Sequence, residues 1–328
     1  MSTAPQMRPD LAGTAVVVVN YGSSHLLAEN LAGTDLGASG VPVVVVDNVT
    51  TPDERVRLRA LAGTHGWTVV EMDRNVGFGA GMNAGVARAR DAGHDVFLLL
   101  NPDASIPVAG LATLVDDVRR EPLTLVTPTI THPDGSPWFR GAWVDVPHGR
   151  TRLSEGVADH PDDAWLAGTC LVVHADLWDA VGGFDDDYFL YWEDIDLSWR
   201  CRTAGGRLAV RSDVRAVHSV GGTQAATGKS PTYYYWNTRN RLLFAAQHLS
   251  RRDLLRWSVR TIPYARAVLL RGGRRQLLHP VAPVGAVVRG SLAGLAIAVR
   301  ALAGRPVRPR TSRAAPGSAA TAREGAPQ

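Results

Sequence analysis

The chain has 328 residues, of which 45% are hydrophobic, so it is long enough for one large domain or two modest ones and too apolar for general disorder. Two cysteines, Cys170 and Cys201, are too few for a disulfide scaffold, and the polar residues 1–10 lack the pattern of a signal peptide, which favours the cytoplasm over secretion. The net charge is +4, but it is unevenly distributed. Residues 251–328 contain fifteen arginines and two acidic residues, a charge of +13, which leaves −9 on residues 1–250. A basic segment therefore follows an acidic one.

Short β-branched runs alternate with amphipathic stretches through the first 120 residues, which predicts an α/β fold with a mostly parallel central sheet. We expect strands and helices to alternate over residues 15–20, 25–31, 41–47, 53–62, 67–71, 79–92, 96–100 and 108–119. Ligands of such sheets bind beyond the carboxyl ends of the strands, so polar residues placed there are candidates for a nucleotide site. These residues are Asn20, Asp47, Arg74, Asn75 and 101–103.

Residues 127–165 are rich in Pro, Gly, His and Trp and are expected to form a flexible, loop-like connection. Beyond them we expect a strand, a helix, an extended run and a helix, at residues 166–174, 193–204, 207–218 and 233–249. The domain should close near Ser250, before amphipathic stretches at 254–271 and 284–303. The predicted division is an N-terminal extension at 1–12, a main domain at 13–250, a basic helical region at 251–305 and a disordered tail at 306–328.

Residues 77–85 are rich in glycine and contain a formal G-x-G-x-x-A match that begins at Gly79, the fingerprint of dinucleotide-binding folds. That fingerprint belongs on the first strand-to-helix turn, whereas this cluster follows the third expected strand, so we reject a dinucleotide site. The cluster is either a helix start that packs closely on the sheet or part of another ligand site.

The tripeptide Asn101-Pro102-Asp103 directly follows an apolar strand, where a carboxylate can hold a divalent cation against a diphosphate. The alternative for Asp103 is an ordinary turn residue whose side chain hydrogen-bonds the nearby backbone. His218 ends an extended run and is either a surface histidine or a metal ligand.

Residues 182–200 combine several carboxylates with several aromatic side chains. Acidic residues at a helix start often interact only with the helix dipole, which would explain Glu193 or Asp196 taken singly. However, a carboxylate in an aromatic, partly dehydrated setting has a raised proton affinity, as a general base acting on a hydroxyl requires. Asp194 is therefore the candidate base, with Glu193 as the fallback.

Together these segments resemble the family 2 glycosyltransferases of the GT-A fold, and among them the bacterial rhamnosyltransferases that build cell-wall and polysaccharide linkers. The resemblance covers residues 15–250, with the segments in the family's order and at suitable spacing. Each segment alone is common, and only the ordered set is specific. The matching segments are Asn20-Tyr21, Asp47-Asn48, 74–79 with Asn83, 101–103, 165–170, 183–185 and 191–194.

The resemblance implies an inverting enzyme that moves a sugar from a nucleotide diphosphate to a hydroxyl, with Mg²⁺ or Mn²⁺ as cofactor. It makes Asp194 the catalytic base and places the metal on Asp103, completed by His218. The residues implied to bind the donor are Asn20, Tyr21, Asp47, Arg74, Asn75, Gly77, Asn83, Asn101 and Asp103. Those implied on the acceptor side are Trp165, Tyr191, Trp192, Arg239 and Arg241.

One departure from the family bears on the metal, because the family's motif is often D-x-D and its first acid is Asn101 here. A degenerate, non-catalytic sugar-nucleotide-binding partner therefore stays open. A nucleotidyltransferase would also be α/β and metal-dependent, but it should carry a basic, Gly-rich phosphate loop after the first strand, and residues 20–24 lack the charge. Galactosyl-, glucosyl- and N-acetylglucosaminyl-transferases that use UDP-sugars share much of the pattern.

The resemblance alone suggests dTDP-L-rhamnose as donor, and a polyprenyl-diphosphate-linked saccharide is the expected acceptor. The acceptor also has a physical motive, since the arginine-rich C-terminal stretches read as helices that lie on anionic lipid. Arg289 and Arg300 interrupt the last apolar run, so a spanning helix is not expected. No nucleic-acid motif accompanies the arginines, so nucleic acid is not an expected partner. We expect a cytoplasmic enzyme, peripheral at the inner face of the cell membrane, and leave a homodimer open.

Overall fold

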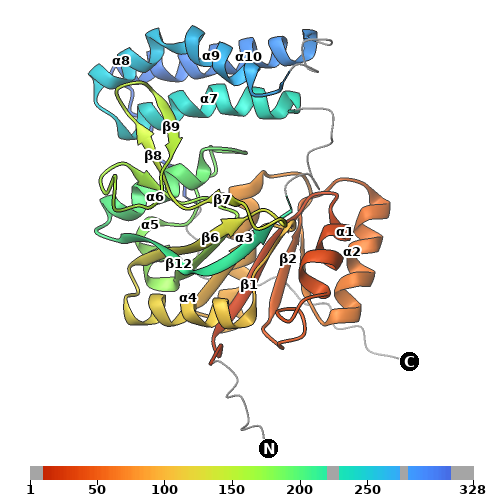
Figure 1. The fold of residues 1–328 in the computed structure, drawn as a ribbon. Coiled ribbons are helices and arrows are strands. Elements are labelled where there is room, and N and C mark those ends of the chain that lie inside the picture. The colour runs from red at the N-terminus through yellow and green to blue at the C-terminus, as the bar shows by residue number, and fades with distance from the viewer. Residues whose placement is uncertain (1–9, 220–228, 274–279, 312–328) are drawn as a thin grey trace, which may run out of the picture.

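The computed structural model describes residues 10–219, 229–273 and 280–311. A nine-stranded sheet lies at the centre, with strand order β3-β2-β1-β4-β11-β6-β12-β5 and β7 paired to β6. Helices cover both faces of this sheet, and a layer of four helices lies across one end of its strands (Figure 1). The α/β class is confirmed.

The first half of the chain forms the parallel part of the sheet, as expected. The strands are β1 (Thr14–Asn20), β2 (Val43–Asp47), β3 (Thr68–Glu71) and β4 (Val96–Leu100), all mutually parallel where they pair. The main helices between and after them are α2 (Pro52–His65), α3 (Phe78–Asp91) and α4 (Val108–Arg120). The helix expected at 25–31 is instead a short α1 (Ser24–Leu27) continued by a π-helical turn, η1 (Ala28–Ala32).

Alternate residues of β1 explain why its apolar run is continuous. Val16 and Val18 join a cluster that includes residues of α2 and α4, whereas Val17 and Val19 join a cluster that includes Met82 of α3. Every residue of β1 is buried because both faces of the sheet are covered. The carboxyl ends of these strands are left as the place where polar residues can meet a ligand.

The prediction that residues 127–165 form a flexible connection is wrong. They contribute to a long strand of the main sheet and to a small three-stranded sheet of order β10-β8-β9. The Thr-rich β6 is buried along its whole length between β11 and β12, so its polar residues do not mark a loop. The strands are β6 (Thr124–Thr131), β7 (Pro137–Phe139), β8 (Ala142–Asp145), β9 (Arg150–Leu153) and β10 (Ala164–Trp165).

The second half of the chain completes the sheet. The strand expected at 166–174 is shorter, β11 (Cys170–His174), and it runs antiparallel to both β4 and β6. The extended run at 207–218 is confirmed as β12 (Arg207–His218), which pairs parallel to β6 and antiparallel to the two-residue strand β5 (Ala104–Ser105). The helix α6 (Glu193–Thr203) follows the predicted position, and α5 (Ala175–Val181) was not expected.

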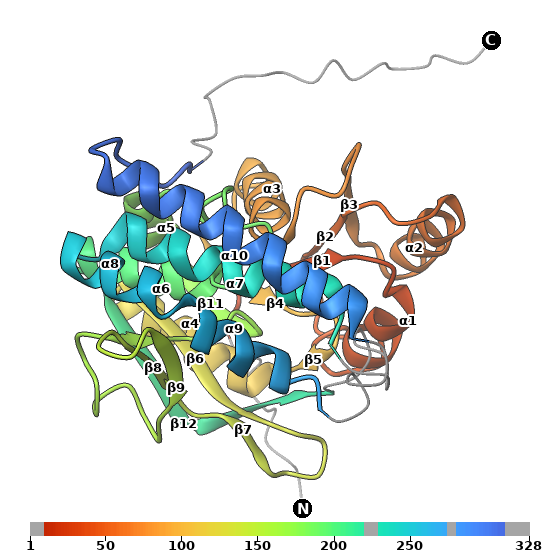
Figure 2. The ribbon, with the colours of Figure 1, turned by 90° about the horizontal axis from the view of Figure 1, so that it is seen from above.

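Four helices form the layer above the sheet, and Figure 2 shows α10 running across α7 with α8 and α9 beside them. Their bounds are α7 (Pro231–His248), α8 (Arg251–Val259), α9 (Thr261–Leu270) and α10 (Val281–Leu302). Leu242, Trp257, Val268 and Val287, one from each helix, belong to a single buried cluster. The boundary expected near Ser250 thus falls inside a packed layer.

Small residues let α10 approach α7 closely. A Cβ on Gly290 would lie 2.3 Å from the Tyr235 carbonyl oxygen, and one on Gly294 would lie 3.1 Å from the Arg239 carbonyl oxygen. By contrast, larger apolar side chains on other sides of α10 are exposed; they are Val281, Val284, Val288, Leu292 and Val299. By length and composition, α10 is also apolar enough to cross a membrane, with a mean hydropathy of 1.7 and a third of its most apolar stretch buried.

The first residues of the predicted tail contact Asp185, which precedes α6. The backbone N–H of Arg310 donates to Asp185 Oδ1 at 2.8 Å, and Thr311 forms a β-bridge with Asp185. Residues 312–328 lie outside the described part of the chain.

Candidate active site

The carboxyl ends of β1 and β2 lie side by side, as their parallel register requires. Asn20 is buried, and its Oδ1 accepts hydrogen bonds from the backbone N–H and the hydroxyl of Ser23, so it shapes the turn after β1. Asp47 is 2% exposed and pairs with Arg55. Tyr21, which follows Asn20, is 55% exposed and so can meet a ligand from solution.

The loop before α3 is braced both by Asn48 and by Asn75 of the loop itself. Asn48 Nδ2 donates to the Gly77 carbonyl at 3.0 Å, and its Oδ1 accepts from the Val76 N–H at 2.8 Å. Asn75 Oδ1 accepts from the Gly77 N–H at 2.9 Å, while Arg74 points into solvent. These contacts hold the predicted donor loop against the end of β2.

Gly77 ties this loop to the segment that precedes α6. Its φ is +89°, a conformation that favours glycine, and a Cβ there would lie 2.3 Å from the Phe189 carbonyl oxygen. The next residue, Phe78, donates its N–H to the same carbonyl at 2.9 Å. The glycine is therefore required by the close approach of two chain segments more than 100 residues apart.

Asn83 does not fit the donor-binding role that was predicted for it. Its Nδ2 donates to the Phe184 carbonyl and to Asp186 Oδ1, and its Oδ1 accepts from the Phe184 N–H at 2.9 Å. Because the whole amide is used within the protein, Asn83 anchors residues 184–186 onto α3.

The structure brings Asp103 and His218 together, as the predicted metal site requires. His218 Nε2 lies 3.1 Å from Asp103 Oδ1, and both side chains are almost fully buried, at 9% and 7% exposure. Trp138 packs edge-on against the imidazole, with centroids 4.5 Å apart, and His218 Nδ1 has no hydrogen-bond partner among the residues that the structure describes. Within the described ranges no cluster of three or more His, Cys, Asp or Glu side chains occurs, and Asp103 and His218 are the two candidate ligand side chains that lie together here.

The dipeptide Gly168-Thr169, just before β11, links this pair to the candidate base. The Asn101 N–H donates to the Thr169 carbonyl at 2.9 Å, which seats the turn that carries Asp103. The Gly168 N–H donates to Asp194 Oδ2 at 3.1 Å. Two hydrogen bonds on adjacent residues thus place the metal-site turn and the candidate base beside each other.

Asp194 begins α6 in a partly buried setting. Its Oδ1 accepts from its neighbour Ile195 N–H at 2.9 Å. Burial raises the pKa of Asp194 to about 6, against the opposing effect of hydrogen bonds from the Gly168 and Ile195 N–H groups. A carboxylate with this pKa is mostly ionised at neutral pH and still basic enough to take a proton from a hydroxyl in a transition state.

Glu193 is more deeply buried, and its Oε2 has no hydrogen-bond partner in the described part of the chain. Burial first, and then the neighbouring Asp194 charge, raise the pKa of Glu193 well above its usual range. Glu193 therefore keeps its proton while Asp194 loses one, because two adjacent buried carboxylates resist double ionisation. The environment favours Asp194 over Glu193 as the base.

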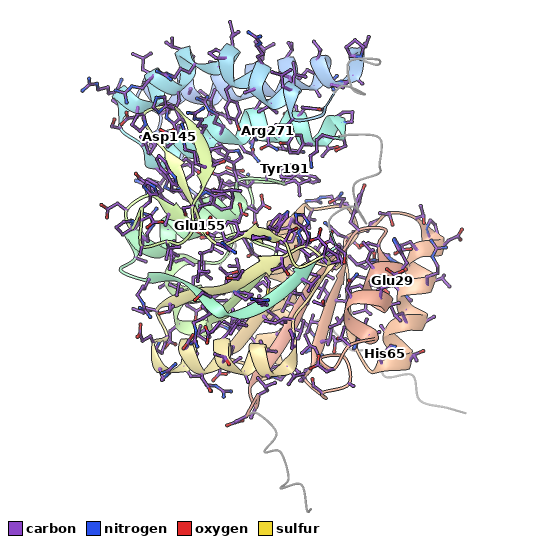
Figure 3. All side chains as sticks on the ribbon, viewed as in Figure 1. Glu29, His65, Asp145, Glu155, Tyr191 and Arg271 are labelled. Carbon is purple, nitrogen blue, oxygen red and sulfur yellow. The ribbon has the colours of Figure 1, made fainter. Side chains whose placement is uncertain are left out.

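Tyr191 and Trp192 lead into α6 with an unusual backbone. Their φ angles are +65° and +74°, in the left-handed region that non-glycine residues rarely adopt. Tyr191 is half-buried and lies between the helical layer and the sheet, as Figure 3 shows, whereas Trp192 is 4% exposed and packs against Trp257. Tyr191 thus keeps the exposure that an acceptor contact needs, and Trp192 is mainly a core residue.

Trp165 belongs to a row of aromatic rings that ends at the Asp103–His218 pair. Its centroid lies 5.6 Å from that of Phe139, which neighbours Trp138 and so leads to His218. The indole Nε1 of Trp165 is buried and has no hydrogen-bond partner within the ranges that the structure describes.

The two predicted acceptor arginines lie in different surroundings. Arg239 is half-buried, and its Nη1 donates to the Asp187 carbonyl at 2.8 Å and to Asn240 Oδ1 at 2.6 Å. Arg241 is 1% exposed, with its guanidinium near the rings of Trp257 and Tyr264, and burial lowers its pKa to about 10. An acceptor role does not fit Arg241, because it lies in the interior of the helical layer.

Some residues that shape the site carried no assigned role in the sequence. Gly168 lies in a segment matched to the family, but only the fold shows its N–H on Asp194. Trp138 lies in the region taken for a loop, so its contact with His218 had no signal. Asn48 follows Asp47 in a matched pair, and an amide after a strand end was the one available hint.

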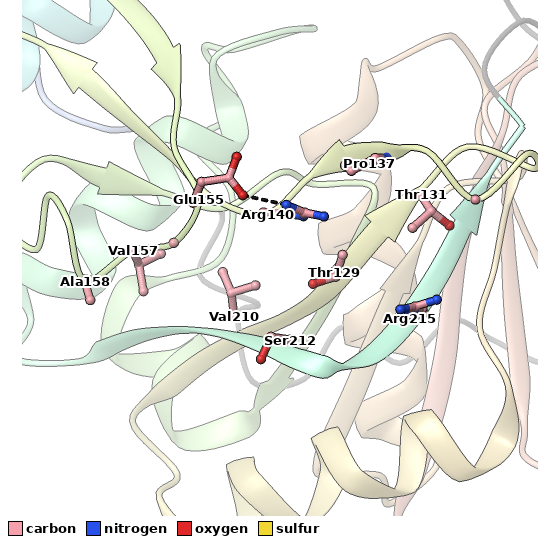
Figure 4. Close-up of a pocket in the computed structure, with 12 residues that line it drawn as sticks. Thr129, Thr131, Pro137, Arg140, Glu155, Val157, Ala158, Val210, Ser212 and Arg215 are labelled. Carbon is pink, nitrogen blue, oxygen red and sulfur yellow. Dashed lines mark hydrogen bonds and ion pairs between the residues drawn. The ribbon is translucent and has the colours of Figure 1, made fainter.

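A cavity among the described residues lies away from the strand ends. It has a volume of about 470 Å³ and opens between the β6–β12 region and the segment that joins β9 to β10 (Figure 4). Arg140, Glu155 and Arg215 line it, and Arg140 pairs with Glu155 at 2.6 Å. None of the predicted site residues lines this cavity, so it is separate from the site at the strand ends.

Residues 15–156 match a family model described as "Glycosyl transferase family 2". An N-acetylglucosaminyl-diphospho-decaprenol L-rhamnosyltransferase of Mycobacterium tuberculosis is 27% identical over 280 residues, which cover 75% of this chain and 88% of that protein.

Two solved structures share the fold. PcManGT, a mannosyltransferase from Pyrobaculum calidifontis in complex with GDP-Man and Mn²⁺, has a TM-score of 0.53 at 18% identity, over 90% of this chain and 88% of that one. GalNAc-T7 with UDP, GalNAc and Mn²⁺ has a TM-score of 0.51 at 16% identity; the match covers 90% of this chain and spans 59% of the length of GalNAc-T7. The shared fold confirms the expected GT-A type, and the family match over residues 15–156 and the mycobacterial relative show that this chain is similar to family 2 glycosyltransferases and to an L-rhamnosyltransferase.

Proposed function

We propose that this enzyme transfers L-rhamnose from dTDP-L-rhamnose to a hydroxyl of a polyprenyl-diphosphate-linked saccharide, with inversion at the anomeric carbon. The observation that carries the proposal is the position of Asp194, a buried carboxylate with a raised pKa, hydrogen-bonded beside the turn that bears Asp103. The sugar and the lipid-linked acceptor are supported by the similarity to an L-rhamnosyltransferase named for a decaprenol-linked acceptor.

In the proposed reaction Asp194 accepts the proton of the acceptor hydroxyl as that oxygen attacks the anomeric carbon. The bond from that carbon to the diphosphate breaks in the same step, so the nucleotide diphosphate leaves with the electron pair. No covalent enzyme intermediate is required. Glu193 stays neutral beside Asp194, and its neutrality avoids a second negative charge next to the base.

Asp103 and His218 fit a divalent cation as two of its ligands. The pair is buried, and His218 Nε2 and Asp103 Oδ1 face each other at 3.1 Å, close enough for both atoms to bind one cation. A carboxylate suits Mg²⁺ or Mn²⁺, and the imidazole nitrogen favours Mn²⁺ over the harder Mg²⁺. When bound, such a cation would neutralise charge that develops on the leaving diphosphate.

The donor would lie along the strand ends. Asp47 and the exposed Tyr21 flank the carboxyl ends of β1 and β2, where the nucleoside is expected. The loop at Asn75 and Gly77 connects the expected nucleoside site to the segment before α6. The donor would therefore lie between Asp47 and Asp194. Arg74 is free to reach a phosphate from solvent.

A lipid-linked acceptor would require the enzyme to work at a membrane surface. The helices α8, α9 and α10 expose large apolar side chains, of which Ile262 is 81% and Val259 is 75% exposed. The segment that contains them carries a net charge of +13, which attracts anionic lipid. We place this layer on the cytoplasmic face of the membrane, with α10 lying in the interface because its small-residue side is packed on α7.

The test is product formation by the purified protein with Mn²⁺. It is offered dTDP-rhamnose, UDP-galactose, UDP-glucose and UDP-N-acetylglucosamine, each with a lipid-linked and a soluble acceptor, and with Asp194→Asn as the inactive control. We expect rhamnose transfer to the lipid-linked acceptor, with the inverted anomer visible by NMR. Preference for a UDP-sugar would refute the donor, and equal rates on a soluble acceptor without membranes would refute the lipid-linked acceptor.

A further inference from the structure

The base-bearing segment is held in a strained conformation by a side chain from another element. The strain lies in Tyr191 and Trp192, two successive non-glycine residues with positive φ immediately before the acidic start of α6. Such a backbone conformation is unfavourable for a residue with a Cβ, so it persists only where surrounding contacts impose it. Asp194 follows Trp192 by two positions, so its placement depends on those contacts.

Asn240 makes the contacts that face this segment from α7. Its side chain is fully buried, and its Nδ2 donates to the carbonyls of Leu190 at 3.0 Å and Tyr191 at 2.8 Å. Both hydrogens of this amide therefore bond to the two carbonyls that flank the positive φ of Tyr191. An unpaired buried carbonyl would be costly, so the strained conformation and the amide stabilise each other.

The amide is itself oriented by a neighbour. Arg239 Nη1 donates to Asn240 Oδ1 at 2.6 Å and to the Asp187 carbonyl at 2.8 Å, and its guanidinium lies 5.2 Å from the Trp236 ring centroid. Trp236 in turn stacks on Phe189 with centroids 5.0 Å apart. One face of α7 thus contacts several residues of the segment 187–191, which leads to the base.

We propose that Asn240 is a positioning residue for the transfer reaction, which holds residues 190–192 in the left-handed conformation that presents Asp194 to the acceptor. The inference rests on the proposed function for the identity of the base. It does not depend on which sugar is transferred. Arg239 supports the same task by fixing the Asn240 amide, which accounts for it without a contact to the acceptor's diphosphate.

The helix offers a matched control in Asn237. This residue is the same type, is 7% exposed and lies one turn away on α7, but among the described residues its Nδ2 donates within the helix, to the Tyr233 carbonyl at 3.0 Å, and not to residues 190–192. Substitution of either asparagine by alanine removes a buried amide from the same helix. Only Asn240→Ala removes hydrogen bonds to the base segment.

The first measurement is hydrogen–deuterium exchange of the full chain, which needs no substrate. We expect Asn240→Ala and the nearly isosteric Asn240→Leu to lose protection in peptides that cover residues 188–196, and Asn237→Ala to retain it. Unchanged protection in both Asn240 variants would overturn the proposal. Failure of both variants to fold, with Asn237→Ala folded, would also overturn it by making Asn240 a folding residue.

The second measurement is steady-state kinetics with whichever nucleotide sugar the wild type uses. We expect Asn240→Ala to lower kcat by about 10- to 100-fold, with the KM for the donor within twofold and the pH inflection of kcat displaced, since Asp194 would gain solvent. Asn237→Ala should leave both kcat and the inflection in place. Equal kcat in the two variants would refute the positioning role of Asn240. An inactive wild type that shows the expected exchange pattern would instead refute the proposed function, while the contact of Asn240 with residues 190–192 would stay supported.

Discussion

The ionisation of Asp194 predicts a specific pH dependence of turnover. Burial raises its pKa to about 6, and the base must be ionised to accept the proton. At pH 5, one unit below this pKa, about a tenth of the enzyme carries the ionised base, and at pH 7 about nine tenths does, so kcat should rise about ninefold over this range. Above pH 7 it should level off.

The same shift predicts how Asp194 affects stability. Its pKa in the folded chain is about 6, above the ordinary value of 3.8, so the folded state holds the proton more tightly than the unfolded state. The resulting stabilisation is fully present below about pH 4 and is lost as the pH rises through about 6, by roughly 3 kcal/mol. The enzyme therefore gains activity over the same pH range in which this group ceases to stabilise the fold.

The assay is kcat at saturating donor and acceptor between pH 5 and 8, for the wild type, Asp194→Asn and Glu193→Gln. Asp194→Asn should lower kcat by about two to four orders of magnitude and remove the inflection, with donor binding retained. Glu193→Gln copies the neutral form of Glu193, so its loss should be smaller and its inflection preserved. A flat wild-type profile, or near-normal turnover in Asp194→Asn, would refute the assignment of the base.

Three further predictions concern the metal, the membrane and the helical layer. Chelation, or Asp103→Ala, should abolish transfer and should abolish Mn²⁺ binding, which is measured by calorimetry with nucleotide diphosphate present. Asp116→Ala, on the exposed face of α4, should leave both intact, and full activity in chelator would make the reaction metal-independent. Ile262→Asp should weaken binding to anionic vesicles, measured by sedimentation, by about tenfold or more, and raised salt should weaken it further. Val56→Asp on the distant α2 should have no effect, and salt-insensitive binding would exclude an electrostatic contribution. Trp257→Ala should lower the free energy of unfolding by about 3–5 kcal/mol in denaturant titrations, because this fully buried ring packs on Trp192 and its Nε1 donates to the Val146 carbonyl; a loss under 1 kcal/mol would show that the layer contributes little to the fold.

Prediction from the sequence succeeded where the signal is local. The apolar runs that became β1 and β4 and the acidic start of α6 all follow from patterns within a few residues. It failed for residues 127–165, since short strands with Thr and Pro carry little periodicity of their own. The strand conformation of β6 depends on pairing with β11 and β12, which come from later in the chain, whereas β8, β9 and β10 pair with one another.

By itself, the sequence determined the α/β class, the polar residues at the strand ends and the carboxylates available for chemistry. Tertiary structure alone decided which of them act together, because the deciding contacts join segments that are distant in the chain. Asp103 meets His218 across 115 positions, and Gly168 meets Asp194 across 26. It also decided that Arg241 lies inside the helical layer while Asn240, its neighbour, reaches the base segment. Adjacent residues on a helix point in different directions, and only the packing of that helix tells which direction is the site.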